Sequence, residues 1–118
     1  TDPGKRREFA ARALAMVRER HARYFTGPTA AYAELESLFL TMEGVGQWAA
    51  YRLARMNAGG NDAEALRLVR DNKKYWSQDQ GLALFLLVDA LVPNWQARVF
   101  ALAPASPFAL LEEAVASR

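Results

Sequence analysis

The sequence predicts an all-α protein, an orthogonal or irregular bundle of about six helices in a single domain of residues 1–118. Apolar residues recur at spacings of three and four along most of the chain, as they do in amphipathic helices. The alternating pattern of half-buried strands is absent, and the chain contains no isoleucine. With 52% apolar and 24% charged residues, the composition is typical of a soluble, folded domain.

The first predicted helix covers residues 5–25 and ends at Thr26-Gly27-Pro28, because glycine and proline interrupt the helical pattern there. Its arginines are expected to face solvent. The apolar residues expected to face the core are Phe9, Ala13, Met16, Val17 and Tyr24.

Thr29 is the predicted N-cap of a long second helix over residues 30–57, which ends before Gly59-Gly60. Apolar residues at helical spacing form one stripe along its whole length, and we expect this stripe to face the core. Its members are Tyr32, Leu35, Phe39, Met42, Gly46, Ala49, Leu53 and Met56.

A short, partly exposed third helix is predicted after Asn61 or Asp62, either of which can cap it. Its expected inward residues are Leu66, Val69 and Trp76. Ser77 and Gln80 have the spacing of a capping box and open a fourth helix. Residues 81–88 of this helix are apolar on nearly every face, which places it at the centre of the domain.

Two short helices complete the predicted bundle. Pro93 ends the central helix, and Asn94 is the expected cap of the next. The large apolar residues of that helix are Trp95, Val99 and Phe100. Ser106 is the expected cap of the last helix, which has Pro107 at its favoured first position and extends to about Ala116.

Positive charge is concentrated at the N-terminus, where residues 1–25 hold seven basic and three acidic side chains. A basic helix can bind phosphates, but arginine also stabilises exposed helices. Because no aromatic side chains or known nucleic-acid motif accompany the arginines, we expect a solvated face and no nucleic-acid partner. The longest apolar run, residues 81–92, is too short to span a membrane, and no signal peptide is recognised.

Few side chains in this sequence suit catalysis. The absence of cysteine excludes thiolate metal sites and cysteine nucleophiles. The single histidine, His21, has no serine or carboxylate partner at local spacing and is expected to be an exposed or helix-end residue. Catalytic zinc typically needs three protein ligands rich in histidine, which this chain does not supply alone. No catalytic residue is therefore predicted.

Glu43 is the most unusual residue in the chain. On a helical wheel it falls within or beside the apolar stripe, and Gly44 and Gly46 follow it at a cost of up to ~1 kcal/mol each relative to alanine. Such glycines allow another helix, a substrate or a metal to approach closely. Glu36 lies on the same face of the predicted helix as Glu43. Two carboxylates on one face can act together in glycosidases, but such pairs are also common on solvated helix surfaces. Two interpretations of Glu43 stay open: a metal ligand, and a partner for an arginine at a tight helix crossing.

The segment Thr41-Met42-Glu43-Gly44-Val45-Gly46-Gln47-Trp48-Ala49-Ala50-Tyr51 resembles the third-ligand helix of gluzincin zinc metallopeptidases. In that family a Glu-Gly-x-(Ala/Gly)-x-aromatic run follows an upstream His-Glu-x-x-His helix. The resemblance implies that Glu43 is the zinc ligand, that the glycines admit close approach, and that the aromatic residues anchor the helix. Residues 75–84 also resemble a segment that follows such a helix in bacterial peptidase-like proteins. His-Glu-x-x-His is absent from this chain, so two zinc ligands and the general base are missing.

The resemblance implies the helical C-terminal portion of a bacterial zinc-peptidase-like protein, inactive alone, which contributes Glu43 and one wall of a substrate cleft. Its cofactor is zinc only if the full-length protein holds the missing ligands, its partner is the remainder of a longer polypeptide, and its substrate is a peptide. The chain begins with Thr1, as a fragment or a processed product does. The alternative is a non-catalytic helical interaction module that binds a peptide or a second copy of itself through Trp48, Trp76 or Trp95, which can also be ordinary core residues.

Overall fold

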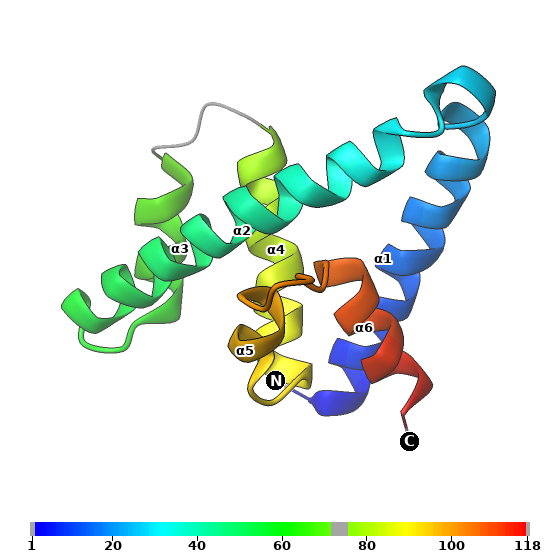
Figure 1. Ribbon diagram of the computed structural model, residues 1–118. Coiled ribbons are helices and arrows are strands. Elements are labelled where there is room, and N and C mark those ends of the chain that lie inside the picture. The colour runs from blue at the N-terminus through cyan, green and yellow to red at the C-terminus, as the bar shows by residue number, and fades with distance from the viewer. Residues whose placement is uncertain (1, 72–75, 118) are drawn as a thin grey trace.

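The computed structural model describes residues 2–71 and 76–117, and Figure 1 shows how they are arranged. These residues form six α-helices and one short 3-10 helix and contain no strand, which confirms the all-α fold. None of the described helices is long and apolar enough to cross a membrane. In chain order the elements are α1 (Pro3–Tyr24), η1 (Gly27–Thr29), α2 (Tyr32–Asn57), α3 (Asp62–Asp71), α4 (Trp76–Leu91), α5 (Trp95–Val99) and α6 (Pro107–Ala116).

Short polar side chains cap three of the helices. Asp2, Asn61 and Ser106 cap α1, α3 and α6, each accepting a hydrogen bond from a backbone amide of the first turn at 2.8–3.1 Å. These bonds satisfy amides that have no partner within the helix. The predicted caps at Asn61 and Ser106 are confirmed, as is the extent of the last helix.

The predicted caps at Thr29 and Ser77 are wrong, and the one at Asn94 lacks its hydrogen bond. Thr29 belongs to η1, and α2 begins at Tyr32 with no side-chain cap. Asn94 does occupy the N-cap position of α5, as predicted, but its backbone is left-handed, with φ 55°, and its side chain makes no capping hydrogen bond. Ser77 lies inside α4, which begins at Trp76, and its hydroxyl group binds elsewhere. A serine that satisfies a local capping pattern can thus instead form a tertiary contact that the local sequence does not reveal.

The central position predicted for α4 is confirmed. Figure 1 shows α2 crossing α4, with α3 beside the C-terminal part of α2 and α6 between α4 and α1. Side chains from α1, α2, α4, α5 and α6 form the larger core cluster, and α2, α3 and α4 form a smaller one. The larger cluster contains Ala10, Leu14, Leu40, Leu84, Phe85, Val88, Trp95, Val99, Phe108, Leu110 and Leu111. The smaller cluster contains Tyr51, Ala65, Val69 and Leu82.

Two glycines make the crossing of α2 and α4 unusually close. A Cβ atom added to Gly44 would lie 2.5 Å from Cδ2 of Phe85 and 2.8 Å from the carbonyl oxygen of Gly81. A Cβ atom added to Gly81 would lie 2.8 Å from Cα of Gly44. Packing between the two helices therefore requires glycine at both positions, and the expectation that another helix approaches Gly44 is confirmed.

The prediction for the buried side of α2 is wrong. The large side chains of the predicted inward stripe are 50–76% exposed, and its small members, Gly46 and Ala49, are exposed as well. The buried side lies opposite on the helical wheel and includes Leu40, Gly44 and Tyr51. This side is less apolar in composition, but Gly44 allows α2 to approach α4 closely enough to exclude water from it.

Other large apolar side chains that were predicted to face the core are also exposed. α1 buries only a narrow side, centred on Ala10 and Leu14, because it packs mainly against α6 and α4 at one side of the bundle. The predicted inward position of Val69 is confirmed, and Trp95 and Val99 of α5 are buried as well. The exposed residues are Phe9, Met16, Tyr24 and Trp76.

Candidate functional site

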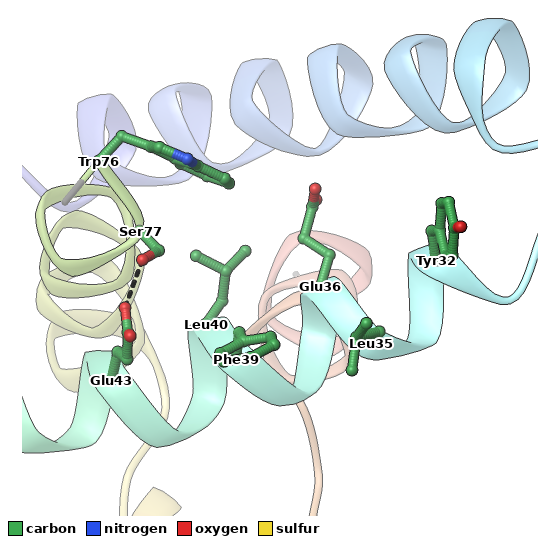
Figure 2. A pocket seen from close by; sticks show the side chains of 8 residues that line it. All are labelled: Tyr32, Leu35, Glu36, Phe39, Leu40, Glu43, Trp76 and Ser77. Atoms are coloured by element: carbon green, nitrogen blue, oxygen red, sulfur yellow. Dashed lines mark hydrogen bonds between the residues drawn. The ribbon is translucent and has the colours of Figure 1, made fainter. Parts of the chain in front are cut away.

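An open pocket lies between the N-terminal half of α2 and the start of α4 (Figure 2). Its volume is about 400 Å³. Most of the lining is apolar, and two glutamates and one serine supply the polar side chains. The lining residues are Tyr32, Leu35, Glu36, Phe39, Leu40, Glu43, Trp76 and Ser77.

Glu43 lies at the end of this pocket where α2 and α4 cross. Figure 2 shows its carboxylate directed toward the first turn of α4, where the Ser77 hydroxyl group donates a hydrogen bond to Oε2. The two residues are 34 positions apart in the sequence, and the close approach at Gly44 brings them together. Sequence reasoning missed this contact because the spacing of Ser77 and Gln80 favoured a capping role.

The arginine considered as a partner for Glu43 is not found in residues 2–71 and 76–117, where no arginine or lysine forms an ion pair with it. The same residues hold no group of three histidine, aspartate or glutamate side chains that could bind one metal ion. Catalytic zinc needs about three protein ligands. The described residues therefore do not fit a zinc ion by themselves, and Glu43 as a ligand stays a prediction that depends on further ligands.

Glu36 is the second carboxylate of the pocket and belongs to an ion pair. Its side chain is 10% exposed and accepts a charged hydrogen bond from Arg20. His21 Nε2 lies 3.2 Å from the same carboxylate oxygen. Both partners come from the end of α1, so Glu36 ties α1 to α2. The structure brings Glu36 and Glu43 to one pocket, but not as two free acids. His21 does lie in the last turn of its helix, and local spacing could not reveal its partner, which lies in the next helix.

Comparison with known proteins does not assign this site. No family model, curated protein or solved structure matches the chain. The resemblance of the segment around Glu43 to the gluzincin helix stays a prediction. The same is true of residues 75–84, of which Tyr75 lies outside the described residues.

The exposed apolar side of α2 continues the pocket along the helix, and we call it the α2 face. Tyr32, Leu35 and Phe39 belong to both the pocket and this face. Single exposed apolar residues are ordinary, but a continuous row along a 26-residue helix is typical of a surface that binds another molecule. The α2 face comprises Tyr32, Leu35, Phe39, Met42, Gly46, Ala49, Leu53 and Met56.

Gly46 provides a second, independent observation at the middle of the α2 face. A Cβ atom added there would meet nothing within 4 Å in the described structure, in contrast to Gly44. Glycine inside a helix costs about 1 kcal/mol relative to alanine. No packing among the described residues explains that cost.

The three tryptophans have different surroundings. Trp95 is 1% exposed, donates its indole N–H to Asp89 at 2.9 Å, and packs edge-on against Trp48 with ring centroids 4.8 Å apart. Trp48 and Trp95 therefore belong to the interior. Trp76 is 60% exposed and lies at the pocket beside the α2 face, where Figure 2 shows its indole ring extending from the start of α4.

Proposed function

We propose that this protein is a non-catalytic interaction module that binds an apolar helix of another polypeptide along the α2 face. The exposure of the α2 face is the observation that carries this proposal. Burial of an exposed apolar side chain stabilises a complex by about 1.5–3 kcal/mol before the costs of association. Six large side chains, each at least half exposed, offer much more apolar area than an isolated surface residue.

Two hollows beside the α2 face support a helix as the bound element. The pocket with Glu43 flanks its N-terminal half. A groove of about 380 Å³ between α2 and α3 flanks its C-terminal half and is lined by Ala50, Leu53 and Leu68 among others. The exposed side chains of α2 form a ridge with a hollow on each side. A helix bound along α2 can place its own rows of side chains in these two hollows.

The test uses two methionines that are similarly exposed but differently placed. Met42 is 65% exposed on the α2 face, and Met16 is 72% exposed on α1. A photoreactive phenylalanine analogue, p-benzoylphenylalanine, replaces each in turn in the full chain, expressed in its native cells. We expect irradiation to give one discrete covalent adduct from position 42 and none from position 16. The same adducts from both positions, or none from position 42, would overturn the proposal.

A second candidate function keeps Glu43 as the third ligand of a zinc site completed by another segment. Two observations favour it: Glu43 lines an open pocket, and its described partner is a neutral serine rather than a basic residue. Glu43 would supply one carboxylate oxygen, and zinc would supply the Lewis acidity of a metallopeptidase. The test is the sequence encoded upstream of Thr1 in the gene. A His-Glu-x-x-His motif is expected there, and its absence would exclude this function.

A further inference from the structure

We infer that the partner of the α2 face is the α2 face of a second copy of this chain, packed antiparallel around a two-fold axis near Gly44. This inference rests on the proposed function and names its partner. Three features of α2 favour this pairing: the spacing of the face, the sizes of its residues and the distribution of charge along the helix.

The spacing of the α2 face is that of a coiled-coil seam. Its eight residues follow one another at alternating intervals of three and four from Tyr32 to Met56, which are the a and d positions of four heptads. The members of such a seam stay on one side of a helix that winds around a similar helix. Helices packed on a globular core have similar spacing, but this stripe is exposed, and a second helix with the same spacing can cover its whole length.

The sizes of the residues favour an antiparallel pair in one register. With the axis near Gly44, Phe39 of one copy lies opposite Ala49 of the other, and Met42 lies opposite Gly46. Leu35 lies opposite Leu53, and Tyr32 lies opposite Met56. Large residues thus meet small ones at the centre, as close packing of two helices requires. A parallel pair would place Phe39 against Phe39 and leave Gly46 opposite Gly46.

Other antiparallel registers fit less well. A shift by one heptad toward the N-terminus places Phe39 opposite Met42 and leaves Leu53 and Met56 uncovered. The opposite shift places Gly46 against Ala49 and leaves Tyr32 and Leu35 uncovered. Only the register centred near Gly44 covers the whole face and also gives Gly46 an opposing side chain. That register explains a helical glycine for which packing among the described residues gives no reason.

The charges along α2 also favour the antiparallel arrangement. Its acidic residues, Glu34, Glu36 and Glu43, lie in the N-terminal half, and its basic residues, Arg52 and Arg55, lie in the C-terminal half. An antiparallel pair therefore sets the acidic half of one helix beside the basic half of the other, whereas a parallel pair sets like charges together. Glu34 and Arg52 flank the seam on the same side and come close in the proposed register. Three of the five charged side chains have partners in their own chain: Glu36 pairs with Arg20, Glu43 accepts a hydrogen bond from Ser77, and Arg55 pairs with Asp62. Glu34 and Arg52 therefore supply the charge complementarity between the two copies.

The first measurement is the molecular mass of the full chain by sedimentation equilibrium over a concentration series. We expect reversible dimers, and we expect Met42→Glu to weaken dimerisation about tenfold or more because it places a carboxylate in the seam. Met16→Glu is the matched control and should leave the dissociation constant unchanged. Both positions are exposed, so circular dichroism should show wild-type helix content in both variants. Equal effects of the two substitutions would overturn the inference.

The second measurement fixes the orientation and uses the absence of cysteine from the chain. Leu35→Cys and Leu53→Cys are made as separate variants and oxidised alone and as a mixture. In the proposed register, two copies of either cysteine are about 27 Å apart along the axis at 1.5 Å per residue, too far for a disulfide. We expect disulfide-linked dimers from the mixture only. Disulfide-linked dimers from each variant alone would indicate parallel helices and overturn the antiparallel arrangement.

The two proposals fail in different ways. A strictly monomeric chain at high concentration would overturn self-association. The proposed function would then still stand if photo-crosslinking at Met42 gave a discrete adduct with a different polypeptide, and it would fall if position 42 gave none. A crosslink from position 42 to the second copy supports both.

Discussion

Gly44 and Gly46 lie two positions apart in α2 but have opposite surroundings. Gly44 contacts α4, where an added Cβ would collide with Phe85 and with backbone, whereas an added Cβ at Gly46 would meet only open space. Both glycines lower the helical propensity of the segment by a similar amount. Only at Gly44 does packing within the described structure offset that cost.

The two glycines should therefore respond differently to substitution by alanine. Gly44→Ala is expected to destabilise the chain by about 1–3 kcal/mol, because the α2–α4 crossing must open. Gly46→Ala is expected to stabilise the monomer by up to about 1 kcal/mol through helical propensity. Urea unfolding followed by circular dichroism, at a protein concentration low enough to keep the chain monomeric, measures both. A loss of stability in Gly46→Ala similar to that in Gly44→Ala would show that the space around Gly46 is not open.

The sequence was sufficient to identify Glu43 and its glycines as unusual, because a carboxylate and two glycines beside an apolar stripe conflict with a simple amphipathic helix. It was not sufficient to identify Ser77 as the partner of Glu43. That contact depends on the α2–α4 crossing, and a serine three positions before a glutamine satisfies a local rule equally well.

At the scale of one element, α2 shows why helical periodicity predicts a helix but not its orientation. One side carries a regular apolar stripe, and the other carries Leu40, Gly44 and Tyr51. Both sides offer apolar surface, and the more regular one is exposed. Which side of α2 is buried depends on how closely that side packs against α4, and the sequence of α2 alone does not contain this information. The starts of α3 and α6 were predictable because an N-cap acts within the first turn of its helix.

Tyr51 connects α2 to the start of α3. Ionisation of its hydroxyl group should change the free energy of unfolding of the chain as pH rises. Its hydroxyl group donates to Asp62 Oδ1 at 2.8 Å. Burial raises the pKa of Tyr51, and the hydrogen bond to Asp62 raises it further. Because the neutral phenol is favoured in the folded state, this group stabilises the fold fully below the ordinary tyrosine pKa. That stabilisation is lost as pH rises through the raised value.

Tyr51→Phe tests this connection between the two helices. At neutral pH the substitution should cost about 1 kcal/mol, the value of a typical hydrogen bond. The difference in unfolding free energy between wild type and variant should narrow above about pH 10, where the unfolded tyrosine ionises first. Urea titrations at several pH values between 7 and 11 measure this difference. A difference that stays constant across that range would contradict the role assigned to the Tyr51 hydroxyl group.

At the scale of the whole molecule, the two core clusters should differ in stability. The larger cluster joins α4 to four other helices, whereas α3 is held by the smaller cluster through Ala65 and Val69. Regions with few buried apolar contacts open at lower free energy than the rest of a domain. The described structure therefore predicts that α3 separates from α2 while α4 keeps its packing.

Native-state hydrogen exchange measures this difference directly. Amides of α3 are expected to exchange at least about tenfold faster than those in the middle of α4, which corresponds to an opening free energy lower by about 1.4 kcal/mol. Tyr51→Phe should increase exchange in α3 selectively, because it removes the Tyr51–Asp62 hydrogen bond that connects α3 to α2. Gly44→Ala should increase exchange in α4 as well, because it disturbs the crossing on which the larger cluster depends. Equal protection of α3 and α4 in the wild-type chain would instead indicate that the two clusters unfold as one cooperative unit.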